Sequence, residues 1–129
     1  ESQPGFVYNL DQQGQNKIFC IVTEGPIDAN YIDATSIMGS EISDQQAMLL
    51  NRLNKDIIVV PDRDNKGKDL AEQAIELGWK VSLPDWSTDC NDVGDAVLKY
   101  GNIYTLYSIA NAAESSPLKI RLRMKKWFK

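Results

Sequence analysis

Short apolar runs rich in β-branched residues alternate along the chain with segments whose apolar residues recur every three or four positions. A run of the first kind predicts a strand, and one that is almost continuously apolar predicts a strand buried on both faces of a sheet. The spacing of the second kind predicts an amphipathic helix. The predicted strands are 17–25, 35–39, 56–60 and 79–84, and the predicted helices are 26–34, 43–53, 68–78 and 93–101.

This alternation predicts an α/β fold with a mostly parallel sheet of about four strands flanked by helices. Residues 5–10 form a further apolar run ahead of the sheet, and the polar turn after it predicts a hairpin with the strand at 17–25. We therefore expect an N-terminal strand and turn at 1–16, a central α/β domain at 17–100 and a C-terminal helical extension with a basic tail at 101–129.

The secondary structure of the basic tail is left open by its pattern. The preceding segment, 102–115, has helical spacing and is predicted to be a helix. Ser116 as a cap and Pro117 at the first position favour another helix over the last residues. The strict alternation from Lys119 to Lys125 suits a strand with one basic face equally well.

The charge of the chain is unevenly distributed. Six of the 14 basic residues lie in the segment 119–129, which holds no acidic residue, while the whole chain has a formal net charge of −4. An acidic body with a basic tail favours a body that binds cations and a tail that contacts phosphate, although a solvated linker helix explains the tail as well. Trp127 and Phe128 would be exposed on this chain alone, so we expect a neighbouring domain or partner to cover them.

The composition excludes several classes of enzyme. The 129 residues include no histidine, which excludes Ser-His-Asp and Cys-His nucleophiles and any zinc site that uses histidine. Cys20 and Cys90 form no CxxC pair, and we expect a reducing compartment, the cytoplasm. No apolar run approaches the ~20 residues that cross a bilayer, so we expect no membrane contact. Because the chain begins with Glu1 rather than Met, we expect a piece of a longer polypeptide.

Acidic residues follow three of the predicted strands. Ligands gather at the carboxyl ends of parallel strands, so we expect these acids to converge at one edge of the sheet. Residues two apart in extended backbone project alike, so Asp62 and Asp64 can face one point while Arg63 projects the opposite way. The acids are Glu24 at the end of the first strand, Asp62 and Asp64 after the third, and Asp85, Asp89 and Asp92 after the fourth.

Carboxylates that lie close together repel one another unless a cation lies among them. With oxygen ligands and no histidine, the expected ion is Mg²⁺, with Mn²⁺ as a substitute. Gly67 allows a close backbone approach, and the helix after it points its N-terminus at the same place, with Lys66 and Lys68 within reach of a phosphate. For Asp64 alone, a capped solvated loop is the simpler interpretation, but for the whole set of acids we favour a metal site.

Four segments resemble the TOPRIM domain, which bacterial-type DNA primases share with type IA and type II topoisomerases and some nucleases. They are "VTEGPIDA" at 22–29, "IMGS" at 37–40, "VVPDRDNKGK" at 59–68 and "LPDWSTDCND" at 83–92. The glutamate, glycine and D-x-D of that domain occur in order, over roughly 17–100. "EGPIDA" and "DRDNKG" are most similar to the primases of tailed phages. The resemblance implies synthesis of short RNA primers on a single-stranded DNA template from nucleoside triphosphates, with a replicative helicase and other domains of the polypeptide as partners.

The resemblance also implies roles for individual residues. Glu24, Asp62 and Asp64 match the metal ligands, and Glu24 is in addition the candidate acid or base. Gly67 and Lys68 match the glycine and basic residue that follow D-x-D in primases. The positions implied to support these ligands or the nearby backbone are Gly25, Asp28, Gly39, Asp85, Asp89 and Asp92.

Three other functions are compatible with parts of this pattern. A TOPRIM nuclease or topoisomerase-like enzyme would use the same acids to cleave a strand. An aspartyl-phosphate phosphatase also places D-x-D at a strand end, but it would give Glu24 no role, and Asn65 and Lys66 stand where it needs Thr or Val. A non-catalytic replication module would only dock partners, and the presence of all three metal acids argues against it.

Overall fold

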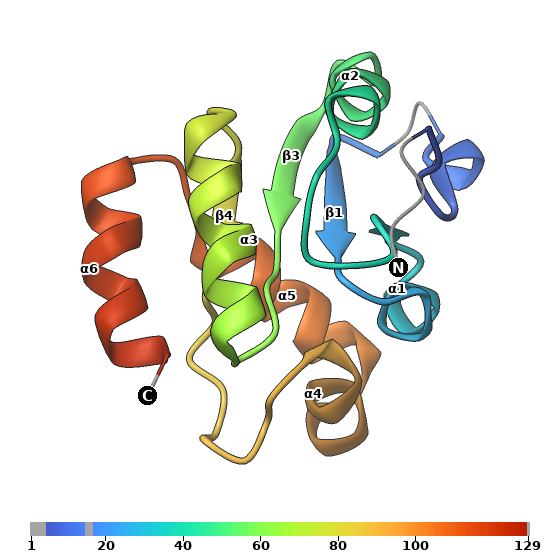
Figure 1. The fold of residues 1–129 in the computed structure, drawn as a ribbon. Coiled ribbons are helices and arrows are strands. Elements are labelled where there is room, and N and C mark those ends of the chain that lie inside the picture. The colour runs from blue at the N-terminus through green and yellow to red at the C-terminus, as the bar shows by residue number, and fades with distance from the viewer. Residues whose placement is uncertain (1–4, 15–16, 129) are drawn as a thin grey trace.

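The computed structural model describes residues 5–14 and 17–128, which form helices on the two faces of one sheet (Figure 1). None of the helices in these ranges is long and apolar enough to cross a membrane. In chain order the elements are the 3-10 helix η1 (Leu10–Gln12), β1 (Phe19–Thr23), α1 (Pro26–Ile32), β2 (Thr35–Ser36), α2 (Asp44–Asn51), β3 (Asp56–Val59), α3 (Asn65–Glu76), β4 (Lys80–Ser82), α4 (Val93–Tyr100), α5 (Asn102–Ala112), β5 (Ala113–Glu114) and α6 (Pro117–Trp127).

The sheet has the strand order β2-β1-β3-β4-β5. β1 is parallel to β2 and β3, and β3 is parallel to β4, while β5 is antiparallel to β4. The predicted α/β fold with a mostly parallel sheet flanked by helices is therefore confirmed. The sequence pattern gives no sign of β5, because this strand has two residues, Ala113 and Glu114, at the end of a segment with helical spacing.

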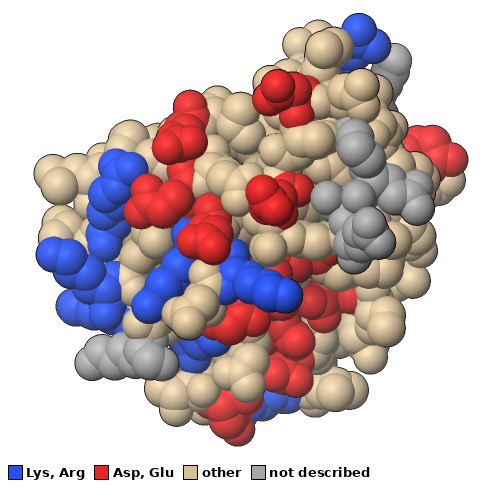
Figure 2. All heavy atoms as spheres, in the orientation of Figure 1, with Lys and Arg blue, Asp and Glu red and all other residues tan. Residues whose placement is uncertain are grey.

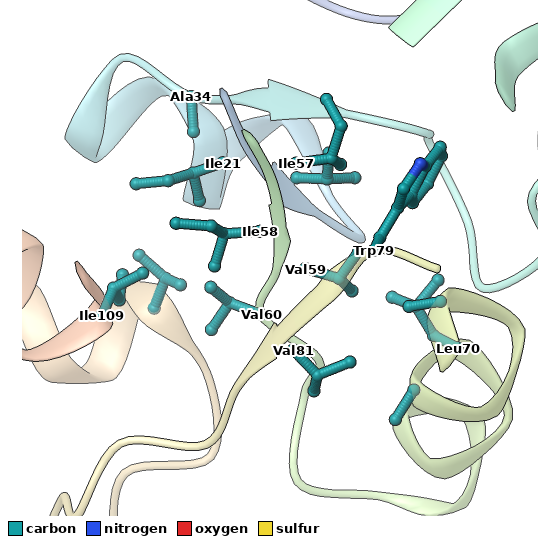
Figure 3. Close-up of a cluster of buried hydrophobic side chains, with 14 of the residues drawn as sticks. Ile21, Ala34, Ile57, Ile58, Val59, Val60, Leu70, Trp79, Val81 and Ile109 are labelled. Atoms are coloured by element: carbon teal, nitrogen blue, oxygen red, sulfur yellow. The ribbon is translucent and has the colours of Figure 1, made fainter. Parts of the chain in front are cut away.

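The core lies on both faces of the sheet because the central strand β3 is apolar on both sides. In Figure 3, Ile58 and Val60 point toward Ile109 of α5, whereas Val59 points toward Leu70 of α3 on the opposite face. These five side chains are at most 3% exposed. A strand alternates its side chains between two faces, so a continuous apolar run fits burial under helices on both sides.

The predicted N-terminal hairpin is wrong. Tyr8 forms an isolated antiparallel bridge with Ser36 of β2, and its N–H donates to the Ser36 carbonyl at 2.8 Å. The chain then turns into η1 through Asn9, which has a φ of 63°. A hairpin with β1 is impossible because β2 and β3 already occupy both edges of β1. Part of the predicted turn, residues 15–16, lies outside the described residues.

The basic tail forms the helix α6, as the predicted cap residue Ser116 indicated. The Ser116 hydroxyl accepts a hydrogen bond from the Lys119 N–H at 3.4 Å and so caps this helix. Trp127 and Phe128 are only 6% and 8% exposed, so the prediction that this pair is exposed is wrong. Helix α6 runs alongside α3 (Figure 1), and the Trp127 indole N–H donates to the Pro84 carbonyl at 2.7 Å. The chain itself therefore covers the two rings, which pack edge to face at 5.0 Å.

Candidate functional site

The ends of β1 and β3 place two acidic residues beside each other. The parallel register aligns Val22 with Val59, so the segments that follow these strands emerge together. The carboxylate Oε2 of Glu24 accepts a hydrogen bond from the backbone N–H of Asp62 at 2.9 Å. Glu24 is 8% exposed, so its carboxylate is largely removed from water and is fixed to the backbone that carries Asp62.

Helices α1 and α4 bring two more acids toward this place. Asp28 lies in the first turn of α1, and its Oδ1 accepts from the Gly94 N–H of α4 at 3.0 Å. Asp92 caps α4 and accepts from the Asp95 N–H at 2.8 Å. A Cβ on Gly94 would lie 2.9 Å from Asp28 Oδ1 and 3.4 Å from Asp92 Oδ1. Glycine at this position, which sequence reasoning did not single out, therefore lets the two helices bring their carboxylates together.

Four other acids act on the carboxyl group of Asp62. Burial raises its pKa from 3.8 to about 8, together with the negative charges of four acids whose effects decrease in the order Glu24, Asp28, Asp92 and Asp64. A carboxyl whose neighbours are also carboxylates holds its proton because ionisation would add a further like charge. We call these five residues, Glu24, Asp28, Asp62, Asp64 and Asp92, the acid cluster.

Two other members of the acid cluster are perturbed in the same direction. Burial and the charge of Asp92 raise the pKa of Asp28 to about 6. Burial raises the pKa of Glu24 as well, against the hydrogen bond from Asp62 and the weaker attraction of Lys66. Three carboxyl groups at one edge of the sheet are thus held in an environment that disfavours their ionised forms. A cation among them would remove that penalty.

Asp64 is turned toward the helix that follows it. Its Oδ1 accepts from the Gly67 N–H at 2.7 Å, which caps α3 and starts this helix at Asn65, three residues before the predicted start. A Cβ on Gly67 would overlap the Asp62 carbonyl oxygen and lie 2.8 Å from its carbonyl carbon. The first turn of α3 therefore lies directly on the Asp62 backbone, and Lys66 and Lys68 are exposed on that turn.

The two sequence-predicted glycines near Glu24 act on its backbone. Gly25 is the N-cap residue of α1 in extended conformation, and a Cβ there would meet no atom of the described residues within 4 Å, its chain neighbours aside. Gly39, in the loop after β2, donates its N–H to the Glu24 carbonyl at 3.0 Å. Both glycines therefore shape the chain at the end of β1.

Two acids of the loop after β4 lie apart from the acid cluster. Asp89 is exposed and pairs with Lys99 at 3.2 Å. Asp85 is exposed and lines a hollow between α5 and α6. Of the three acids predicted in this loop, Asp92 is the one that reaches the cluster, because it is the residue that caps α4.

The donor set of the acid cluster fits a hard dication, which prefers carboxylate oxygens. Within the described residues, no three acidic or thiol side chains are already gathered as the ligands of one ion. Oε2 of Glu24 and Oδ1 of Asp64 accept hydrogen bonds from backbone N–H groups. The three expected ligands thus come to the same strand ends, but the charge of Asp64 affects the pKa of Asp62 less than the charges of Asp28 and Asp92 do.

Arg63, between the two aspartates of D-x-D, turns away from them and holds the loop after β4. Its Nη1 donates to the Ser87 carbonyl at 3.1 Å and its Nη2 to the Trp86 carbonyl at 3.3 Å. Its guanidinium lies 4.6 Å from the centre of the Trp127 ring. The Arg63 backbone N–H donates to the Asn91 carbonyl at 2.8 Å, directly before Asp92. Sequence reasoning gave the direction of Arg63 but not this role, which depends on the path of the loop after β4 and on the unpredicted position of Trp127.

Replacing Arg63 by methionine is expected to lower the free energy of unfolding by about 2 kcal/mol. The change removes two charge-assisted hydrogen bonds and a cation–π contact, and it leaves two carbonyls without their donors. The loss is limited because Nε of Arg63 is buried with no hydrogen-bond partner among the described residues, and the substitution relieves its desolvation. Urea denaturation measures the change. Arg52→Met, on an exposed arginine, is the control, and an equal effect of the two substitutions would contradict the assigned role.

The fold and the site define a class of protein: a parallel α/β domain that gathers carboxylates at the carboxyl edge of β1 and β3. Within this class, the chain belongs to the Toprim-like family, whose model matches residues 21–96. No curated protein sequence matches the chain significantly.

Several solved structures share this fold. They include the zinc-binding and RNA polymerase domains of the Aquifex aeolicus primase (TM-score 0.72, 17% identity, covering 98% of this chain and 34% of that one). The E. coli primase catalytic core gives a TM-score of 0.70 at 21% identity, covering 96% of this chain and 45% of that one. The DnaG primase catalytic domain bound to ssDNA gives 0.70 at 20% identity, covering 95% and 44%. This chain therefore spans less than half the length of each, and the likeness establishes a common fold.

Proposed function

We propose that this chain is the metal-dependent catalytic domain of a DNA primase that joins ribonucleotides into short primers on single-stranded DNA during phage replication. The observation that carries the proposal is the acid cluster, in which the pKa of Asp62 is raised to about 8 by burial and by four other acids. Family membership and a fold shared with primase catalytic cores support this reaction over other uses of such a cluster. The proposed partners are a replicative helicase and further domains of the same polypeptide.

In this proposal the acid cluster holds Mg²⁺ or Mn²⁺ through Glu24 and Asp62, with Asp28 and Asp92 adding negative charge around them. The bound ion supplies neutralisation of the charge on a nucleoside triphosphate. Glu24 is the candidate acid or base, because a carboxyl with a raised pKa exchanges protons closer to neutral pH. Asp64 keeps the first turn of α3 in place over the Asp62 backbone.

The first turn of α3 supplies the positive charge for the triphosphate. Gly67 donates its N–H to Asp64, so this amide is already used and a phosphate would have to compete for it. The exposed ammonium groups of Lys66 and Lys68 are therefore the groups that contact phosphate in our proposal. The charge of Lys66 already acts on the Glu24 carboxylate, which puts it near the acid cluster.

Isothermal titration with MnCl₂ tests the metal site. The protein is expected to bind Mn²⁺, and Glu24→Gln is expected to weaken binding on the order of 10-fold to 100-fold, because it removes one anionic oxygen donor from the cluster. Glu41→Gln, on an exposed acid outside the cluster, is the control and should bind as the unmodified protein does. Absence of Mn²⁺ binding, or equal binding by all three proteins, would exclude a metal site at the cluster.

Incubation with single-stranded DNA, four ribonucleotides and Mg²⁺ or Mn²⁺ tests the reaction. Short RNA products that require both the template and the dication are the expected result. DNA fragments in place of RNA would assign the site to strand cleavage and overturn the proposal. Products made equally well by the Glu24→Gln variant would show that the acid cluster does not perform the reaction.

A further inference from the structure

Helix α6 lies beside α3, and the two helices enclose a hollow of about 320 Å³. Its wall includes Lys68 and Glu72 of α3, together with Arg121, Lys125 and Phe128 at or just beyond α6. The Lys68 ammonium lies 6.0 Å from the centre of the Phe128 ring. The burial of Trp127 and Phe128 fixes α6 in this position, so the basic tail forms a defined surface of the domain.

The side of α6 that faces α3 carries an excess of positive charge. Arg121 and Lys125 lie one helical turn apart and are exposed, and Lys68 faces them from α3. Arg121 pairs with Glu72 at 2.9 Å, which is the ion pair that α6 makes within the described part of the chain. Lys68 and Lys125 form no ion pair with the described acids, so three basic side chains face one acid around the hollow.

The opposite side of α6 is closer to neutral. Lys119 and Arg123 lie one turn apart there, but the hollow that they line toward α5 also contains Asp85 and Glu114. The Arg123 Nε is further engaged with the Leu83 carbonyl at 2.9 Å. The two sides of α6 thus differ in the charge that they present. Substitutions on the side closer to neutral can therefore serve as a control for substitutions on the side that faces α3.

The positive charge continues from α6 to the acid cluster through the first turn of α3. Lys68 lies two residues after Lys66, whose charge acts on Glu24. Figure 2 shows basic side chains gathered over the side of the molecule formed by α6 and next to acidic side chains. We call Lys66, Lys68, Arg121 and Lys125 the basic strip. We propose that the basic strip binds the phosphates of a single-stranded nucleic acid and leads that strand to the acid cluster.

A nucleic acid fits this surface better than a lipid bilayer does. A helix that lies in a bilayer interface presents a continuous apolar face to the lipid. Ile120 and Trp127 of α6 are 1% and 6% exposed and pack into the domain, so the large apolar side chains that α6 leaves exposed are Leu118 and Leu122, which do not make a continuous apolar face. A polyanion that runs past the metal site is also what the proposed function requires, and the choice of partner rests on that function.

Fluorescence anisotropy of a fluorescein-labelled dT20 strand, measured over a range of NaCl concentrations in EDTA, tests the strip. The unmodified chain is expected to bind with an affinity that falls as salt rises. Arg121→Gln/Lys125→Gln is expected to reduce the slope of log affinity against log salt by about 1.4, about 0.7 for each lost phosphate contact. Lys126 is exposed and lies seven residues, about two helical turns, after Lys119, so it is on the same side of α6 as Lys119. The control Lys119→Gln/Lys126→Gln removes the same charge from that side and should leave the slope almost unchanged.

Three results would overturn the proposal: no binding of dT20 by the unmodified chain, equal loss in both double variants, or binding to phosphatidylserine vesicles in place of dT20. Thermal melts confirm that both variants fold. Both should also bind Mn²⁺ as the unmodified chain does, and a loss of Mn²⁺ binding would show that the substitutions act through the fold. If the chain binds dT20 through the strip but binds no Mn²⁺, the proposed function fails while the strip remains.

Discussion

Replacing Gly67 by alanine is expected to lower the free energy of unfolding by about 3 kcal/mol or more. Alanine is the better helix former by about 1 kcal/mol, so helix propensity alone predicts the opposite sign. The expected loss arises because the new Cβ would overlap the Asp62 carbonyl oxygen. Relief requires either the first turn of α3 or the Asp62 backbone to move, which breaks the Asp64 cap or shifts the hydrogen bond to Glu24.

Urea denaturation followed by circular dichroism measures this change. Gly25→Ala is a matched control, because it adds the same methyl group beside another acid of the cluster, where no atom of the described residues lies within 4 Å, its chain neighbours aside. Its expected effect is about 1 kcal/mol or less, the cost of a poorer N-cap residue. Gly67→Ala equal to or more stable than the unmodified chain would show that α3 does not rest on the Asp62 backbone.

The sheet was predictable because its central strands are apolar on both faces. Ile58 and Val60 face one layer of helices and Val59 the other, so a run of such residues indicates a buried parallel strand without further information. The elements that the sequence did not predict depend on which strands of the sheet have a free edge. Tyr8 pairs at β2 because β1 has no free edge, and β5 is a two-residue strand that exists only because it meets the free edge of β4.

The burial of Trp127 was unpredictable for a related reason. An apolar pair in a basic segment indicates exposure when its surroundings are unknown, and only the path of α6 along α3 brings the rings to Pro84 and Arg63. That path also changes how the basic residues of α6 are interpreted. In the sequence they are one cluster, whereas on the helix they form two sides with different neighbours.

At the site, the sequence indicated which strand ends carry acids but not how each carboxylate is used. Glu24 and Asp62 are adjacent because the register of β1 and β3 makes them so. The approach of Asp28 to Asp92 depends on the contact between α1 and α4 at Gly94, which no local pattern reveals. The signal in the sequence that could have indicated this contact is Gly94, a glycine two residues after the acidic helix cap Asp92.

Replacing Asp62 by asparagine is expected to stabilise the metal-free chain at pH 8 by about 2 kcal/mol. In the folded chain the pKa of Asp62 is raised from 3.8 to about 8, so the folded state binds this proton more tightly than the unfolded state does. The stability that the protonated group contributes is complete below pH 4 and is lost as pH rises toward 8. Asparagine is never ionised and removes this loss. Because Asp62 is only partly buried, solvent screening makes the gain smaller than the full pKa shift implies.

The same substitution is expected to weaken Mn²⁺ binding by on the order of 100-fold or more, because it removes the carboxylate on which the four other acids of the cluster act. Urea denaturation in EDTA at pH 4 and pH 8, with MnCl₂ titration at pH 8, measures both effects. Asp85→Asn, on an exposed acid outside the cluster, should change neither quantity. The opposite signs separate function from folding: a variant that is more stable but binds less metal has lost a ligand, not its fold. An Asp62→Asn chain that is destabilised at pH 8, or that binds Mn²⁺ normally, would show that the five acids do not act on one another as described.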